Sequence, residues 1–332
     1  MLNKFILFFS FIILLGCAKD ESVKFSNSVD IFQPKDTISF VYKEERENSK
    51  LESLFNLKEL LNSKSYNLYN SKMNYPFKKV WEINTEQSID DRNPYLPDIL
   101  FFDSKIYLLN TKGYLFKINS DDGKLIWKKQ IFNNIENTII GTPAISGIKN
   151  KNNTITLYAH NGSNNLFAIN GVNGNILWQK KSDLPFRGGI TSYKNYLFVS
   201  DFDGNFLSIN NKNGEVLWNV FLGSEYNSVY TTARPLVVKN KVIVPATGGD
   251  FFVISINNGD VIWNNNISSN QQLPILFHSG DIVANPIYYD GKLYLVSQSG
   301  FTAAFDLETS EKLWNIPIGG VETPAISGKT IF

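Results

Sequence analysis

The sequence predicts an all-β fold of repeated four-stranded antiparallel units, and three observations support this prediction. Tryptophan recurs through the chain at intervals of 46, 51, 40, 45 and 51 residues. A tight-turn sequence precedes most of these tryptophans, and short runs of alternating apolar residues fill the intervals. A period of about 40–50 residues with a tryptophan near the end of each unit is typical of a blade array. The six positions are Trp81, Trp127, Trp178, Trp218, Trp263 and Trp314.

The turn before the tryptophan has a simple physical role. Asp-Gly or Asn-Gly stands at 122–123, 173–174, 213–214 and 258–259, and Thr-Ser replaces it at 309–310. Glycine supplies the left-handed backbone that a two-residue hairpin turn requires and that most other residues avoid. The residues that follow alternate polar and apolar, so we expect an outer strand with its tryptophan on one face.

Three further strands are predicted upstream of each turn, and the first of them often begins with proline. Four short strands joined by hairpins and repeated radially describe a β-propeller. A sixth unit opens at 321–327 and the sequence ends at Phe332. We therefore expect a truncated propeller, from 79 to 332, that lacks further blades. The alternative is a defective six-blade ring that the N-terminal strand closes. The five full blades are expected at 97–131, 140–181, 188–222, 232–267 and 283–318.

The N-terminal region predicts export and lipidation. Lys4 is followed by an apolar run from 5 to 15, too short for a permanent membrane span. The segment ending in Gly16-Cys17 resembles a bacterial lipobox, which makes 1–17 a lipoprotein signal peptide and Cys17 the lipidated residue. The alternative is a plain signal or short anchor with an incidental cysteine. Ala18 follows the cysteine, and the absence of aspartate there favours the outer membrane.

Residues 18–78 lack the repeat and are expected to form a polar, partly disordered tether, with one short amphipathic helix over 51–61. The segment 80–84 carries Trp81 without a preceding turn. We expect it to form a strand that completes the last blade and closes the ring.

Several chemistries are disfavoured by the sequence. The net charge is +1, so a nucleic-acid partner held through phosphates is not expected. The segment 201–205 resembles a calcium loop, but we interpret it as a hairpin turn because calcium needs six or more oxygens. His160 stands beside an Asn-Gly turn and is expected at the surface. No nucleophile, phosphate-loop or metal motif is present, so no catalytic residue, metal or cofactor is expected.

Two of the repeats, 168–178 and 304–314, resemble the tryptophan-docking repeat of quinoprotein propellers. Two families share this repeat. These are the dehydrogenases that use pyrroloquinoline quinone, and the BamB family of outer-membrane lipoproteins. The dehydrogenases carry adjacent cysteines and acidic calcium ligands, whereas Cys17 is the only cysteine here. The resemblance therefore favours BamB, and it implies a ring of eight blades, no enzymatic activity, and a place among the Bam subunits.

The BamB resemblance also implies a partner surface. In that family, two inter-blade connections dock on a POTRA domain of BamA, and the complex assists insertion of unfolded outer-membrane proteins. Here the connections correspond to 223–234 and 268–283. An independent observation indicates the same region, because long loops with apolar clusters mark partner sites; alternatively, these residues fold back and cap the propeller. The expected contact residues are Asn227, Val229, Tyr230, Arg234, Leu276, Phe277 and Asp281.

Two other functions remain open on the sequence alone. One is a dehydrogenase dependent on pyrroloquinoline quinone, since the repeat is specific for the fold and weak for function. The other is a propeller that binds polymers of the cell envelope.

Overall fold

A computed structural model describes residues 79–85, 98–132, 142–223, 232–267, 280–298, 300–327 and 330–331. These residues form five four-stranded sheets and one two-stranded sheet, all antiparallel. The all-β prediction is confirmed. The expected signal peptide and tether, 1–78, lie outside the described residues. No helix in the described part of the chain is long and apolar enough to cross a membrane.

The strands follow one another in chain order within each sheet. The first sheet contains β1 (Ile99–Phe102), β2 (Lys105–Leu109), β3 (Tyr114–Asn119) and β4 (Leu125–Gln130), and the second contains β5 (Ala144–Lys149), β6 (Ile155–His160), β7 (Asn165–Asn170) and β8 (Ile176–Lys181). The third contains β9 (Phe186–Tyr193), β10 (Tyr196–Asp201), β11 (Asn205–Asn210) and β12 (Val216–Phe221). The fourth contains β13 (Leu236–Val238), β14 (Lys241–Pro245), β15 (Asp250–Ser255) and β16 (Val261–Asn266), with the 3₁₀ turn η1 (Thr247–Gly249). The fifth contains β17 (Ile287–Tyr289), β18 (Lys292–Val296), β19 (Thr302–Asp306) and β20 (Lys312–Ile316), and β21 (Ile326–Ser327) pairs with β22 (Thr330–Ile331).

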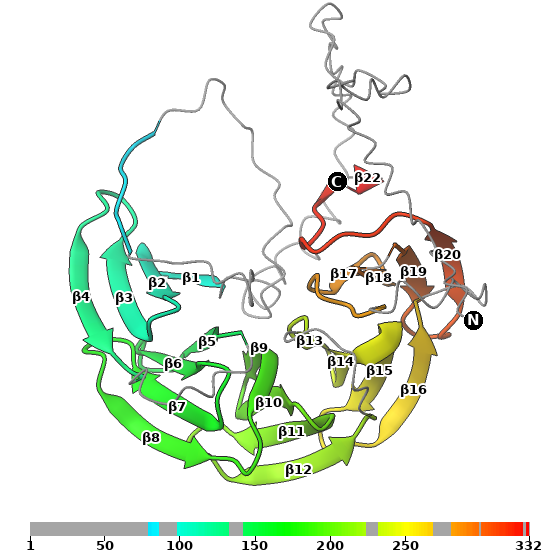
Figure 1. Cartoon of the computed structure of the whole chain (residues 1–332), viewed down its shortest axis with the longest axis horizontal. Coiled ribbons are helices and arrows are strands. Elements are labelled where there is room, and N and C mark those ends of the chain that lie inside the picture. The colour runs from blue at the N-terminus through cyan, green and yellow to red at the C-terminus, as the bar shows by residue number, and fades with distance from the viewer. Residues whose placement is uncertain are drawn as a thin grey trace, which may run out of the picture. The chain divides into compact units, whose positions relative to one another are not determined.

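The five sheets stand side by side, each with its first strand on the inner side and its fourth strand on the outer side (Figure 1). The inner strands of successive sheets contact one another, β1 with β5, β5 with β9 and β9 with β13. This is the radial arrangement expected of propeller blades.

The hydrophobic core lies between neighbouring sheets rather than within one of them. Four clusters of buried side chains each join two successive sheets. Between the second and third sheets, for example, Tyr158 packs with Leu197 and Val199. Because each blade hides its apolar faces only against its neighbours, the blades stabilise one another in sequence, as in other repeat proteins.

A bulge recurs at the start of every outer strand. The pairing of the third with the fourth strand shifts register just before the tryptophan in all five sheets. In the third sheet, Ser208 pairs with Trp218 and Ile209 pairs with Val216, so Leu217 is the extra residue. A bulge leaves one residue unpaired and bends its strand. Leu217 and its paired neighbour Val216 are 47% and 42% exposed.

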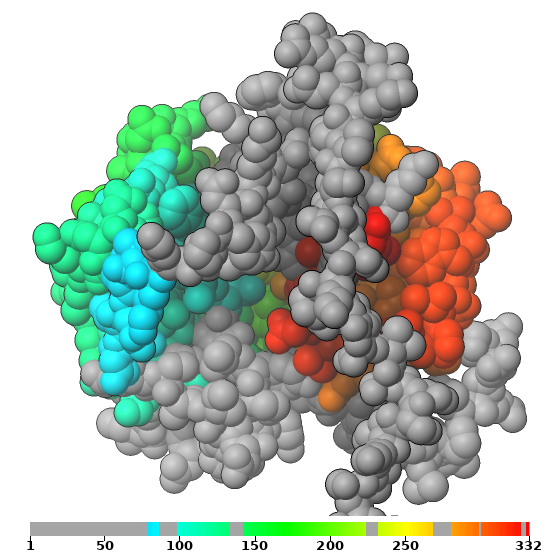
Figure 2. Space-filling model, turned by 90° about the horizontal axis from the view of Figure 1, so that it is seen from above, coloured from blue at the N-terminus to red at the C-terminus, as the bar shows by residue number. Residues whose placement is uncertain are grey.

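Residues 79–85 do not form the expected strand, since they pair with no strand of the described structure. They attach through a side chain instead. The Nε1 of Trp81 donates a hydrogen bond to the carbonyl of Ser120 at 2.7 Å. A Cβ on Gly123 would lie only 2.6 Å from the indole. Figure 2 shows this segment, in bright cyan, lying on the first sheet.

Candidate functional site

Three of the repeat tryptophans, Trp127, Trp178 and Trp218, each donate a hydrogen bond to the turn before the outer strand of the next sheet. Trp127 donates from Nε1 to the carbonyl of Val172 at 2.9 Å, and Trp178 donates to that of Asn211 at 3.1 Å. Trp218 donates to the carbonyl of Ile256 at 2.8 Å. The ring also covers the turn glycine, which has no side chain in the way. A Cβ on Gly174, Gly214 or Gly259 would approach the preceding tryptophan to 3.4, 3.1 and 2.8 Å respectively.

The last two tryptophans differ from this pattern. Trp263 packs against the core between the fourth and fifth sheets, but its buried Nε1 finds no acceptor in the described structure. The turn that the repeat places opposite it contains Ser310 at φ 63° instead of glycine. Trp314 is 37% exposed. Trp263 therefore contributes apolar packing between two sheets without the hydrogen bond, and Trp314 keeps more than a third of its surface exposed.

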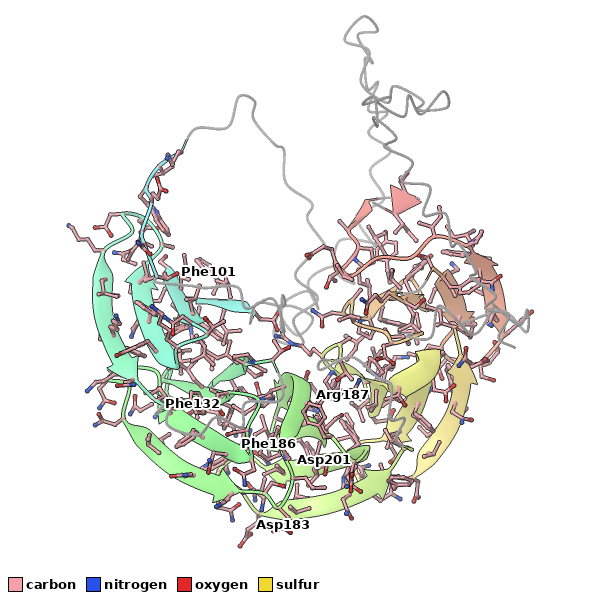
Figure 3. The ribbon with its side chains drawn as sticks, viewed as in Figure 1. Phe101, Phe132, Asp183, Phe186, Arg187 and Asp201 are labelled. Carbon is pink, nitrogen blue, oxygen red and sulfur yellow. The ribbon has the colours of Figure 1, made fainter. Side chains whose placement is uncertain are left out.

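Asp281 lies at the end of the second predicted docking connection and is buried. Its carboxylate pairs with the Nη2 of Arg187 on β9 at 3.4 Å, and both side chains are at most 4% exposed. The backbone N–H of Gly248 donates to the other carboxylate oxygen at 2.8 Å. Burial lowers the pKa of Arg187, and the charge of Asp281 opposes that shift. Figure 3 labels Arg187 on the inner strand of the third sheet.

Arg234 lies at the end of the first predicted docking connection and is also buried. Its guanidinium pairs with Asp98, which precedes β1 in the first sheet. Its backbone N–H donates to the side-chain oxygen of Asn285 at 2.9 Å. Gly189 on β9 approaches so closely that a Cβ there would lie 2.7 Å from the Cα of Arg234. Arg234 therefore connects β9 to the segments that lead into β1, β13 and β17.

The two connections end side by side. The N–H of Ala233 donates to the carbonyl of Ile282 at 3.1 Å. Residue 233 follows the segment 224–231, and residue 282 follows the segment 268–279. Two stretches of sequence that are about 50 residues apart thus return to the body of the protein at one place, next to the Arg187–Asp281 and Arg234–Asp98 pairs.

Of the predicted contact residues, only Arg234 and Asp281 lie in the described structure. Their ion-pair partners, Arg187 and Asp98, were not singled out as site residues by the sequence. The sequence carried a weak signal for Arg187, a charged residue beside two glycines where a blade opens. The remaining predicted residues fall outside the described residues, namely Cys17, Asn227, Val229, Tyr230, Leu276 and Phe277.

His160 is fully buried, so the expectation of a surface position is wrong. Its Nδ1 accepts from the N–H of Gly162 at 3.1 Å, which makes Nε2 the donor to the carbonyl of Gly188 at 3.0 Å. The neutral ring thereby ties β6 of the second sheet to β9 of the third. Burial lowers the pKa of His160 from 6.5 to about 4.

The segment 201–205 forms a turn built on Asp201. One carboxylate oxygen accepts from the N–H groups of Asp203 and Asn205 at 3.0 and 2.9 Å. The other accepts from the Asn205 side chain at 2.9 Å. Both oxygens are thus used within the hairpin. Within the ranges that the structure describes, no three or more His, Cys, Asp or Glu side chains gather in a way that could hold a metal ion.

Several solved structures share this fold. BamB from Moraxella catarrhalis aligns with a TM-score of 0.58 and 17% identity, covering 69% of this chain and 66% of that one, just under two thirds of its length. The computationally designed protein Ika8 aligns with a TM-score of 0.51 at 14% identity, covering 71% and 66% of the two chains. Sqt1 of Saccharomyces cerevisiae aligns with a TM-score of 0.50 at 12% identity, covering 67% and 60%. At these identities the likeness shows the fold alone.

A sequence profile gives the family. No curated protein is significantly similar to the chain. The profile of the family described as outer membrane protein assembly factor BamB matches residues 147–332. Because this match covers more than half of the sequence, the chain belongs to the BamB family.

Proposed function

We propose that this protein is a non-enzymatic scaffold of the outer-membrane β-barrel assembly machinery. It binds the POTRA region of BamA through the connections 223–234 and 268–283, takes its place beside the other Bam subunits, and assists the insertion of unfolded outer-membrane proteins. Cys17 carries the lipid that holds the propeller at the periplasmic face of the outer membrane. Membership of the BamB family supports this proposal.

The observation that carries the proposal is the meeting of the two connections. Their return ends are joined by the Ala233–Ile282 hydrogen bond. A single partner domain can therefore contact both connections at once. A partner that contacts both connections binds more tightly than one that contacts a single connection, because the translational and rotational entropy of association is lost only once.

The burial of Arg234 and Asp281 assigns them a particular part in this surface. A direct contact with BamA would require each side chain to leave an ion pair in which it is at most 3% exposed. Removing one partner of a buried pair costs about 3–5 kcal/mol. We infer that these two residues hold the ends of the connections in place, while the apolar side chains of the connections make the contact.

The test is a titration of the full chain with the POTRA domains of BamA. Leu276→Glu combined with Phe277→Glu is expected to weaken binding by at least about tenfold, because two apolar contacts would be replaced by charges. The matched control is Leu177→Glu, which makes the same change at a rim residue that is 54% exposed. The control is expected to bind like the parent protein.

Asp281→Asn supplies a second measurement. If Asp281 positions the connection rather than contacting BamA, this variant lowers thermal stability and POTRA affinity together. Unchanged POTRA affinity in the Leu276/Phe277 double variant, with folding intact by circular dichroism, would remove the second connection from the BamA surface.

A further inference from the structure

The outer strands of the five sheets each have a free edge, and these edges differ in how well they are protected against pairing with another strand. We propose that the free edge of β12, in the third sheet, is a docking strand for an extended polypeptide with apolar side chains at alternate positions. This inference deepens the proposed function, because it gives the site at which an unfolded outer-membrane strand is held. Figure 1 shows β12 on the outer side of the third sheet.

The hydrogen-bonding groups at this edge follow from the ladder. Leu222, one residue beyond β12, donates its N–H inward to the carbonyl of Gly204 at 2.9 Å. Backbone groups of successive residues in an antiparallel strand alternate in direction. The N–H and C=O of Asn219 and Phe221 therefore point away from β11, toward the free edge. The same alternation applies at the equivalent positions of the other sheets, one and three residues after each tryptophan.

The equivalent edges of the other sheets are guarded. Lysines flank the edge of β4 at 128 and 129 and that of β8 at 180 and 181. On β16, the outward N–H of Asn266 is already bonded to the side-chain oxygen of Asn265 at 2.8 Å. After β20 the position is Pro317, which has no N–H. Lysine, proline and local capping are the devices by which natural sheets prevent edge pairing.

The edge of β12 has none of these devices. Its six residues, from Val216 to Phe221, contain no charge and no proline. Phe221 is 64% exposed, and Leu217 and Val216 are 47% and 42% exposed. Asn219 and Phe221 make no side-chain hydrogen bond or ion pair within the described structure. An exposed, uncharged, apolar edge of this length is the kind of strand to which another strand adds.

The chemistry of the edge selects the occupant. Two sets of N–H and C=O groups, two residues apart in a strand, match the backbone of another strand. Trp218 and Val220 form one face of β12, toward the fourth sheet, while Leu217 and Phe221 form the other. An added strand would extend both faces, so its apolar side chains would lie beside exposed apolar side chains. A strand of a membrane barrel, with apolar residues at every second position, has this pattern.

The experiment uses the full chain and a fluorescent ten-residue peptide of alternating valine and threonine. Anisotropy titration is expected to show binding that Phe221→Lys weakens by at least about tenfold, since it places on β12 the charge that guards β8. The matched control, Leu177→Lys on β8, adds a lysine to an edge that already has two, and is expected to change the affinity less than about twofold. Asn219→Pro removes only an outward N–H and should weaken binding as well.

A second peptide separates strand pairing from general apolar adhesion. It has the same side chains but carries N-methyl groups on all of its backbone amides, which removes the N–H donors from both edges of the strand. The proposal requires that this peptide bind at least about tenfold more weakly than the first. Equal binding of the two peptides, or equal effects of the Phe221 and Leu177 variants, would overturn it.

Sedimentation tests the rival occupant, a second copy of this chain paired edge to edge. A dimer of the parent protein that Phe221→Lys converts to a monomer would assign the edge to self-association and overturn the proposal. The POTRA titration remains independent. A protein that binds BamA but not the peptide refutes this inference alone, whereas one that binds the peptide but not BamA refutes the proposed docking surface alone.

Discussion

We call the packed contact between two neighbouring sheets a joint. The joint between the second and third sheets and that between the fourth and fifth are built from the same repeat. They differ in how the tryptophan contacts the opposing turn. At the first of them, Trp178 covers Gly214 and donates to the carbonyl of Asn211 at 3.1 Å. At the other, Trp263 keeps its apolar contacts but its Nε1 has no acceptor in the described structure, and the opposing turn contains Ser310.

The difference shows what the turn glycine contributes. A glycine allows the indole to lie against the backbone, which brings a turn carbonyl within reach of Nε1. Serine at φ 63° adds a side chain and backbone strain at the same point. A buried N–H without a partner loses about 1–3 kcal/mol relative to one that is bonded. The joint between the fourth and fifth sheets is therefore expected to be the weaker of the two.

The largest effect is expected from Trp178→Ala. It removes a ring that packs with Tyr158 at a centroid distance of 6.1 Å, together with the hydrogen bond to Asn211. Truncation of a fully buried tryptophan costs about 3–5 kcal/mol, and the loss at the partly buried Trp178 is expected toward the lower end of that range. Thermal unfolding followed by circular dichroism should show a melting temperature lower by at least several degrees. An unaltered melt would mean that the joint does not depend on this ring.

Acid should weaken the joint between the second and third sheets through His160. Its folded-state pKa, about 4, lies below the ordinary value of 6.5, so folding favours the neutral ring. Its contribution is complete above pH 6.5 and is lost as the pH falls toward 4. The shift corresponds to roughly 3 kcal/mol. Urea unfolding between pH 7 and 4 should show this loss, and His160→Gln should have a shallower pH dependence. Equal slopes in the two proteins would contradict the assignment.

A smaller effect is expected at the turns. Gly214→Ala forces an alanine to φ +79° and places its Cβ 3.1 Å from the Trp178 ring. The left-handed backbone alone costs about 1–2 kcal/mol. The reciprocal change, Ser310→Gly, relieves strain at the weaker joint and should stabilise by less than about 1 kcal/mol. The comparison fails if both substitutions shift the urea midpoint in the same direction.

The smallest effect, and the sharpest comparison, comes from phenylalanine at the two indoles. Both Trp178→Phe and Trp263→Phe reduce the volume of the ring, but only the first removes a hydrogen bond. Trp178→Phe should therefore cost about 1 kcal/mol more than Trp263→Phe. Equal losses in unfolding free energy would show that the hydrogen bond at Asn211 contributes nothing measurable.

Tryptophan spacing predicted the fold because the repeat is local: turn, strand and indole lie within about ten residues of one another. The pairings at the candidate site are not local. Arg187 and Asp281 are 94 residues apart in the sequence, and Asp98 and Arg234 are 136 apart. Nothing in one sequence links such positions. His160 was misplaced for a similar reason, since its neighbour across the joint, Gly188, belongs to another blade.

The contact of each indole with the following turn also bears on how the protein can be divided. A fragment cut at a sheet boundary has two incomplete contacts. At its C-terminal end, the last tryptophan has lost the turn of the next sheet. At its N-terminal end, the first turn glycine has lost the indole that covered it. The piece that preserves one complete closure runs from the strand before an indole through the next Asn-Gly turn, so it overlaps two blades. Fragments bounded in that way should be more soluble than fragments that follow the sheets. A comparison of the soluble yield of fragments ending at residues 222 and 260 would measure the difference.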